Sequence, residues 1–350
     1  MTIRDIAERT GISPATVSRV LNHPSIVRPA LRERVQKAVA ETGYLPHGVA
    51  RSLASARTRT MGAVVPTVDS ALFARVVDGL QHAIHAAGHQ LLLSSSGYDL
   101  AREAAEVRAL VERGVDALML VGLSHDPTVY DLLQARGVPY VTTCSWTAAM
   151  AEPGIGWDNV ESAMRVARYL LDIGHRRLAV IAGPTRDNDR AAGRRAGFLR
   201  ALAERGIPPG DCPVVEMPYT IPDARNAMSA LLRRTPRPTA VLCGNDILAF
   251  GALQECLWAG VRVPEDVSIT GFDDIDMAAH CHPSITTLRV PAFDVGAKAG
   301  ELLLAALRTG SCPPAIRIEL ELVVRATTAP PAAPDSVARL RKGRLRDRTS

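Results

Sequence analysis

The sequence lacks the features of membrane-inserted and secreted proteins. It has no run of about 18 apolar residues, and its N-terminus has no hydrophobic signal core. Its cysteines are scattered without a CxxC pair, which argues against a zinc site and a disulfide framework. We therefore expect a cytoplasmic protein with buried free thiols. The six cysteines are Cys144, Cys212, Cys243, Cys256, Cys281 and Cys312.

Familiar catalytic motifs are also missing. The chain has no glycine-rich phosphate loop with a lysine, no GxSxG elbow and no HExxH pair. His82, His85 and His89 are spaced three and four residues apart, but no carboxylate or fourth ligand accompanies them, so we expect them on the outer face of a helix. We therefore expect no enzyme activity, no metal site and no cofactor.

Positive charge is concentrated in the first part of the chain. Lysine is scarce, with three residues against 38 arginines, which we attribute to coding bias. Residues 1–60 carry ten basic and four acidic residues, whereas the whole chain of 350 residues has a net charge of only +5. A tail at 331–350 adds six basic and two acidic residues, so the long middle part is acidic. The basic N-terminal part is where contacts to nucleic-acid phosphates are expected.

The first 22 residues predict a helix-turn-helix. Thr2 and Asp5 have the spacing of a capping box, and a helix should follow as far as Thr10. Ser13 is an N-cap residue, and Pro14 is a favoured first residue for a second helix. Short patterns of this kind also occur in other soluble proteins, but here the pattern lies in the basic N-terminal segment.

The second helix of this motif has one face for packing and one for contact. Val17, Val20 and Leu21 lie at i, i+3 and i+4 and should pack on the first helix. Such a helix lies in the major groove of DNA, where Arg19 can read guanine through O6 and N7. Pro14 can make only apolar contacts, and the hydroxyl and amide side chains are expected on phosphates. The expected DNA contacts in this segment are Thr2, Ser13, Pro14, Ala15, Thr16, Ser18, Arg19 and Asn22.

Five motifs in a fixed order resemble those of one family. They are SPATVSRVLN, GYLPHGVARSL, VPEDVSITGFDD, PSITTLRVP and ELVVRATTAP, and with them the chain resembles the lactose and galactose repressor (LacI/GalR) family over nearly its full length. The resemblance implies a bacterial transcription regulator in which Arg19 reads a base and Leu53 enters the minor groove. One departure is Arg28, where the family has a Ser or Thr cap before the helix expected at Pro29–Thr42. A missing cap costs about 1 kcal/mol.

The segment around Leu53 has the composition of a hinge. Gly43, Pro46 and Gly48 interrupt the chain before it, so VARSLA is too short to be a stable helix and should order only on DNA. An apolar side chain inserted at a base step kinks the duplex. The alternative for Leu53 is a plain linker contact. The phosphate candidates around it are Arg51, Arg57 and Arg59.

From Met61 onward, apolar strands alternate with amphipathic helices. This alternation predicts two parallel sheets, each flanked by helices. The family resemblance implies a periplasmic-binding-protein-like α/β domain of two lobes, with three crossovers and a ligand cleft. The expected strands are 61–66, 91–95, 117–122, 139–143, 178–183, 239–244 and 267–271. The expected helices are 72–87, 102–113, 128–136, 159–173, 189–205, 222–233 and 246–259.

The fold class is therefore a small all-α helix-turn-helix head followed by a bilobed α/β domain. We expect the head at 1–46, a hinge at 47–60, an effector and dimerisation domain at 61–330, and a disordered basic tail at 331–350. The first lobe should comprise about 61–157 and 289–315, and the second about 158–288 and 316–330.

Polar residues at strand ends predict a small-molecule site in the cleft. Ligands bind beyond the carboxyl ends of parallel strands. Asn245 and Asp273 follow strands, and the resemblance places these two and Arg194 at ligand-contacting positions, with Tyr219 as a pocket aromatic. Asp246 could equally cap a helix, and Asp274 could equally brace a loop. The expected effector contacts are Asp69, Ser70, Phe73, Trp146, Arg190, Arg194, Tyr219, Asn245 and Asp273.

Two departures from the family bear on the effector. Cys144 stands where many sugar-responsive members have an Asp, which weakens the assignment of a neutral sugar. Arg186 and Arg190 would suit a ligand with its own carboxylate or phosphate, such as a sugar acid, although a solvated charged loop is an equal alternative.

We thus expect a repressor that binds an inverted-repeat operator as a homodimer and responds to a small metabolite, a sugar or a sugar acid. Two alternatives are an architectural DNA-binding protein, which would not need a cleft domain, and a small-molecule-binding protein with a vestigial DNA head, which would not keep Arg19 and Leu53. The tail is too short for a coiled coil, so we do not expect a tetramer.

Overall fold

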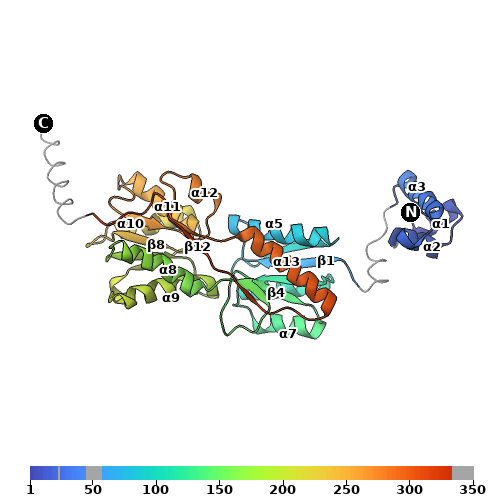
Figure 1. Ribbon diagram of the computed structural model, residues 1–350, viewed down its shortest axis with the longest axis horizontal. Helices are drawn as coiled ribbons and strands as arrows, with labels where there is room; N and C mark the ends of the chain where they lie inside the picture. The colour runs from blue at the N-terminus through green and yellow to red at the C-terminus, as the bar shows by residue number, and fades with distance from the viewer. Residues whose placement is uncertain (23, 45–56, 333–350) are drawn as a thin grey trace. The chain divides into compact units, whose positions relative to one another are not determined.

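The computed structural model describes residues 1–22, 24–44 and 57–332. The chain separates into two compact units, Met1–Thr60 and Met61–Ser350, which are described separately (Figure 1). Within the described ranges, no helix is long and apolar enough to cross a membrane.

The N-terminal unit is a bundle of three helices. They are α1 (Ile3–Thr10), α2 (Pro14–Asn22) and α3 (Pro29–Thr42), with a 3-10 turn at Pro24–Ile26. The predicted capping box is confirmed, since the Thr2 hydroxyl accepts from the Asp5 amide and the Asp5 carboxylate accepts from the Thr2 amide. Gly11, with φ of 62°, ends α1 in the left-handed conformation. The helix-turn-helix is therefore formed as predicted.

A small hydrophobic core holds the three helices together. Ile6 of α1, Val17 of α2 and Val35 of α3 are fully buried against one another. The helix α3 begins after Arg28, whose side chain makes no capping hydrogen bond. The expected absence of a cap is therefore observed, and only Pro29 at the first helical position favours the start of α3.

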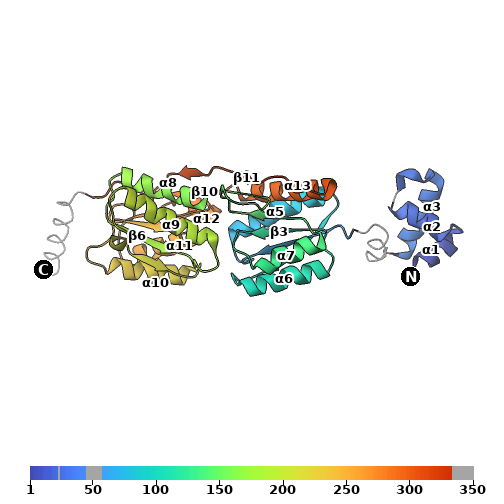
Figure 2. The same cartoon turned by 90° about the horizontal axis from the view of Figure 1, so that it is seen from below.

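The second unit contains two parallel sheets covered by helices (Figure 2). The first sheet has the order β11-β5-β4-β3-β1-β2, and the second has the order β7-β6-β8-β9. Its strands are β1 (Thr60–Val65), β2 (Gln90–Ser95), β3 (Ala117–Val121), β4 (Tyr140–Thr143), β5 (Gly154–Gly156), β6 (Leu178–Ala182), β7 (Val214–Glu216), β8 (Ala240–Cys243), β9 (Ser268–Thr270), β10 (Thr287–Arg289), β11 (Ile316–Arg317) and β12 (Glu321–Val323).

The helices of this unit are α5 (Ala71–Ala86), α6 (Leu100–Glu112), α7 (Pro127–Arg136), α8 (Asn159–Asp172), α9 (Asp189–Glu204), α10 (Ile221–Leu232), α11 (Asp246–Trp258), α12 (Asp276–His280) and α13 (Ala292–Thr309). All seven expected helices are present, and each boundary lies within two residues of its predicted position. The predicted fold class is confirmed.

The chain crosses between the two lobes three times. The crossings follow β5, β10 and β11, and β10 pairs antiparallel with β12 beside them. Ile316 pairs with Ile155 in the first sheet, so the first lobe extends beyond the boundary expected at 315. The reason is that β11 completes the sheet edge next to β5 before the chain crosses for the last time.

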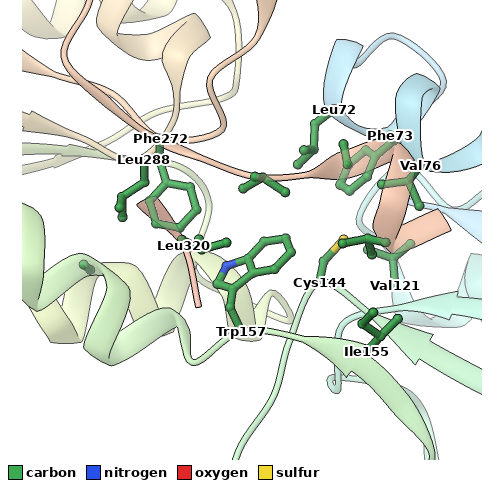
Figure 3. Packing of buried hydrophobic residues seen from close by; sticks show 14 of the residues in the cluster. Leu72, Phe73, Val76, Val121, Cys144, Ile155, Trp157, Phe272, Leu288 and Leu320 are labelled. Carbon is green, nitrogen blue, oxygen red and sulfur yellow. The ribbon is translucent and has the colours of Figure 1, made fainter. Parts of the chain in front are cut away.

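The crossovers share a hydrophobic core that joins the lobes. Trp157 is fully buried, and its ring centroid lies 6.4 Å from that of Phe272 in the second lobe. Leu288 and Leu320, which lie at the other two crossings, belong to the same cluster as Cys144 and Phe73 of the first lobe (Figure 3). The two lobes are therefore hinged around buried apolar contacts.

The helix α13 was not predicted, and it packs along α5 through glycines. A Cβ at Gly79 would lie 2.0 Å from the carbonyl oxygen of Phe293, and a Cβ at Gly296 would lie 1.8 Å from that of Val76. These two glycines allow the helix backbones to approach much more closely than larger residues would. Helix α13 thereby covers one face of the first sheet together with α5 (Figure 1).

Candidate functional site

The second helix of the N-terminal unit presents an exposed face. The Ser13 hydroxyl accepts from the Thr16 amide at 3.3 Å and so caps α2. Val17 and Val20 point into the core, whereas Ala15 and Arg19 are exposed. Arg19 lies in the last turn of α2, on the exposed face of a capped helix, where its side chain is free to reach base edges in a major groove.

The other predicted DNA contacts differ in how the structure places them. Pro14 and Ser13 are exposed, and Thr16 and Ser18 are half-buried. Thr2 is exposed, although its hydroxyl is engaged in the capping box. The side chain of Asn22, the hinge residues Arg51 and Leu53, and the tail beyond residue 332 lie outside the described residues.

A cavity lies between the two lobes of the second unit. Each lobe contributes six lining residues, and most of these follow strands or begin helices at the sheet ends. Side chains fill most of the cleft, and the remaining space of about 30 Å³ would accommodate only a few water molecules. The lining residues are Ser70, Leu72, Phe73, Tyr98, Cys144 and Trp157 from the first lobe and Asn188, Arg190, Arg194, Tyr219, Asn245 and Asp273 from the second.

Seven of the nine expected effector residues line this cavity. The exceptions are Asp69, which is exposed, and Trp146, whose ring lies under the Arg317 guanidinium at 5.0 Å. Trp157, at the first crossover, takes the place expected for Trp146. Tyr98 and Trp157 are cavity residues that were not predicted. Tyr98 lies just after a predicted strand, so the strand-end rule that selected Asn245 could have selected it as well. Trp157 lines the cavity because the chain crosses between the lobes there, and only the family resemblance indicated this crossover.

Arg194 and Asp273 are buried polar groups with unused hydrogen-bonding atoms. Both are 7% exposed, and neither Nε of Arg194 nor Oδ1 of Asp273 has a hydrogen-bond partner. The Arg194 guanidinium lies 4.7 Å from the ring centre of Phe272, and it makes no ion pair with any described residue. Buried polar atoms are nearly always paired, so these two atoms are available to a ligand.

The charge state of Asp273 depends on its surroundings. Burial raises its pKa to about 7, although the neighbouring Arg194 acts in the opposite direction. Its backbone, with φ of 119°, is held by a hydrogen bond from its amide to the Leu288 carbonyl at 2.9 Å. A non-glycine residue in this conformation is strained, and such strain is concentrated at functional sites.

Asn245 lines the cavity as expected and also caps α11, whereas Asp246 takes neither of the two roles that the sequence allowed. The Asn245 side-chain oxygen accepts from the Leu248 amide at 3.0 Å and so caps α11. Asp246 is not the cap. It is fully buried and accepts from Thr287 Oγ1 at 2.6 Å and from the Ile275 amide at 2.9 Å. Burial and the nearby Asp273 raise the pKa of Asp246 well above its ordinary value.

Asp274 braces a loop, which is one of the two roles that the sequence allowed. Its carboxylate pairs with Arg289 at 2.8 Å and with Arg325 at 2.6 Å. It does not line the cavity, so the paired arginines account for its position.

The basic pair expected at Arg186 and Arg190 is not formed. The side chain of Arg186 is 94% exposed and lies beside Asp187, whereas Arg190 is buried and lines the cavity. Cys144 also lines the cavity as a neutral group, because burial raises the pKa of its thiol to about 11. The cations available to an occupant are therefore Arg190 and Arg194.

The three closely spaced histidines do not form a site. His82 and His85 are exposed on α5, as expected, but His89 lies beyond the end of that helix. Among the residues that the structure describes, no group of three or more His, Cys, Asp or Glu side chains could hold a metal ion.

Comparison with known proteins agrees with both units. Residues 2–47 match the model of the bacterial regulatory proteins of the lacI family, and residues 167–328 match a periplasmic binding protein-like domain. The transcriptional repressor CytR of Escherichia coli K12 is 31% identical over 329 residues, covering 93% of this chain and 96% of CytR. The repressor PurR of Klebsiella pneumoniae is 33% identical over 306 residues, 87% of this chain and 89% of PurR.

A solved structure supports the same conclusion. The lac repressor dimer bound to operator and the anti-inducer ONPF is 25% identical, with a TM-score of 0.84, and the match covers 94% of this chain and 99% of that chain. The relatives at 31% and 33% identity align over most of their length and are helix-turn-helix transcriptional repressors. This chain belongs to the lacI family of bacterial regulatory proteins.

Proposed function

We propose that this protein is a repressor that binds an inverted-repeat operator as a homodimer, and that a small metabolite in the interlobe cleft sets its operator affinity. The observation that carries the proposal is the presence, in one chain, of an exposed reading helix and a cleft with two buried polar atoms that have no partner. An architectural DNA-binding protein would have no use for the second feature.

The cleft chemistry favours a sugar or a sugar acid. Asp273 and the Asn245 amide supply an acceptor and a donor for hydroxyl groups. Arg194 forms no ion pair within 4 Å with a carboxylate of the described residues, and the Asp273 carboxyl near it has a raised pKa, so an acidic group on the ligand would balance a buried positive charge. Phe73 and Trp157 supply an apolar wall for the carbon face of a ring. The site residues of this proposal are Ser70, Phe73, Arg190, Arg194, Tyr219, Asn245 and Asp273.

Dimer formation is supported by exposed apolar side chains in both lobes. Leu92 and Leu93 lie on the edge strand β2 and are 37% and 43% exposed, and Trp258 at the end of α11 is 77% exposed. We propose that these side chains become buried in the dimer interface. A twofold dimer would present two heads to two half-sites, as in the operator-bound lac repressor dimer.

The proposed organisation is a head at 1–46, a hinge at 47–60, an effector domain at 61–330 and a basic tail. In the head, Arg19 reads a base, and Leu53 enters the minor groove from the hinge. The protein acts in the cytoplasm, on the chromosome. The polar groups of the cleft bind the effector and do not react with it.

The test is selection of bound sequences from random duplex DNA by the full chain, with and without a pool of sugars and sugar acids. We expect an enriched palindrome whose recovery changes with one compound. Arg19→Ala should relax the preference at one operator position, worth about 1–3 kcal/mol. Arg194→Gln should keep the palindrome and lose the response to the compound. Enrichment without sequence preference or ligand response would favour the architectural alternative.

A further inference from the structure

One pair of residues in the second lobe, Asp189 and Arg190, bonds directly to the first lobe. Both lie in the first turn of α9. The Asp189 carboxylate accepts from the Ser145 hydroxyl at 2.5 Å and from the backbone amides of Leu123 and Ser124. Arg190 Nη1 donates to the Val121 carbonyl at 2.9 Å and to Asp189 at 3.1 Å.

The first lobe is shaped to receive this pair. Gly122, with φ of 90°, lies directly beneath it, and a Cβ there would be 1.8 Å from Arg190 Nη1 and 2.5 Å from Asp189 Oδ1. No side chain larger than hydrogen is compatible with this contact. His125 holds the same loop, because its Nε2 lies 3.0 Å from the Gly122 carbonyl and its Nδ1 lies 2.9 Å from the buried Glu103 carboxylate.

The hydroxyl of Ser145 is oriented toward Asp189. The Asn159 amide donates to Ser145 Oγ at 3.2 Å and to the Cys144 carbonyl at 3.1 Å, and Asn159 Oδ1 accepts from the Trp157 indole. Since Ser145 Oγ accepts from Asn159, its single proton is available for Asp189. Hydrogen bonds to a carboxylate are about twice as strong as neutral ones.

One member of the pair, Arg190, also lines the effector cavity. Tyr98 of the first lobe contacts Tyr219 of the second at 5.6 Å between ring centres. Side chains of both lobes thus meet across the cleft. An effector that takes hydrogen bonds from Arg190 competes with the Val121 carbonyl for them.

We propose that Asp189 and Arg190, seated on Gly122 and Ser145, form a latch that holds the two lobes together across the cleft and that an effector bonding to Arg190 displaces. This inference rests on the proposed function of the cleft as an effector site. The backbone passes between the lobes at three crossovers around an apolar hinge, so a rigid-body opening breaks the latch and leaves each lobe folded. Releasing the latch changes operator affinity as the effector does.

The test uses the full chain with two latch variants, Asp189→Asn in the second lobe and Ser145→Ala in the first. Hydrogen exchange followed by mass spectrometry reports on the first-lobe loop at 121–125. In both variants we expect exchange in this loop to accelerate at least tenfold, while urea unfolding of the domain changes little. Arg186→Ala is the matched control, since Arg186 lies in the same segment before α9 with its side chain 94% exposed.

Operator affinity without added ligand is the second readout. We expect the two latch variants to differ from the parent protein at least threefold, and in the same direction as each other, while Arg186→Ala does not differ. Unchanged exchange at 121–125 overturns the latch, and so does accelerated exchange with unchanged operator affinity. The proposed function fails separately, if no compound of the sugar and sugar-acid pool changes the operator affinity of the parent protein.

Discussion

Replacing Asp273 with asparagine tests the electrostatics of the cleft without knowledge of the effector. Asp273 is 7% exposed, and its Oδ1 has no partner. Burial raises its pKa to about 7, against an ordinary value of 3.8. Asparagine has nearly the same shape and does not ionise, so Asp273→Asn removes the charge and keeps the packing.

The magnitude follows from the difference between the two pKa values. Between pH 3.8 and 7 the folded protein keeps a proton on Asp273 that the unfolded chain has lost, so the free energy of unfolding falls as the pH rises. At about 1.4 kcal/mol for each pH unit, the loss reaches about 4 kcal/mol at pH 7 and stays constant above it. In the Asp273→Asn variant the pKa of Asp246 also falls, because the charge of Asp273 contributes to raising it. The pH dependence of stability that Asp246 contributes therefore decreases as well.

Unfolding in urea, followed by tryptophan fluorescence from pH 5 to 8, measures this effect. All three tryptophans, Trp146, Trp157 and Trp258, lie in the second unit, so the signal reports on that unit alone. We expect Asp273→Asn to flatten the pH dependence and to be more stable than the parent protein at pH 8.

Asp274→Asn is the matched control on the adjacent residue. Asp274 is paired with Arg289 and Arg325, so loss of its charge should destabilise the unit by about 2 kcal/mol at pH 8. If Asp273→Asn were less stable than the parent protein at pH 8 and kept its pH dependence, the buried carboxylate would not be a source of strain and the reasoning would be refuted.

Two further predictions concern stability. Gly296→Ala should destabilise the second unit by about 3 kcal/mol in urea unfolding, because the new Cβ would lie 1.8 Å from the Val76 carbonyl oxygen. Gly210→Ala is the control and should be neutral, because a Cβ there would have no atom within 4 Å. Equal effects of the two substitutions would contradict the packing of α13 on α5. Arg28→Ser should raise the free energy of unfolding of the head by about 1 kcal/mol, because it supplies the missing cap of α3; no gain in far-ultraviolet thermal unfolding would mean that the helix start is satisfied in another way.

The alternating pattern of the second unit predicted seven of the nine helices that the structure describes there, and it missed the short α12 and the long α13. Gly296 and Gly300 lie in the interior of this helix, and each lowers helix propensity by about 1 kcal/mol relative to alanine. The structure explains their presence, since a Cβ at Gly296 would meet Val76 and one at Gly300 would meet Ala83. Packing on α5 therefore stabilises α13, and the local helix propensity of its sequence does not predict it.

The candidate site could be predicted where it depends on strand ends. Asn245 comes two residues after β8 and Asp273 three residues after β9, and Arg194 lies in the second turn of the helix that follows β6. Trp146 was chosen by the same rule, but β4 ends in Thr143 and the chain turns away, so that Cys144 lines the cavity instead. Several residues follow each strand, and the backbone conformation of a single turn decides which of them faces the cleft. At Cys144 this conformation has a φ of 66°, which the periodicity of the sequence does not reveal.

Arg190 shows why contacts between the lobes could not be predicted. The sequence indicated a cationic ligand contact, but its observed partner, the Val121 carbonyl, lies 69 residues away on another sheet. Nη1 donates to both the Val121 carbonyl and Asp189, so a ligand acceptor that bonds to Nη1 replaces one of these contacts between the lobes. The same side chain therefore takes part in closure and in the effector cavity, so effector binding and lobe closure share one set of hydrogen bonds. A ligand shifts a conformational equilibrium only by its difference in affinity for the two states, and competition for Arg190 supplies such a difference.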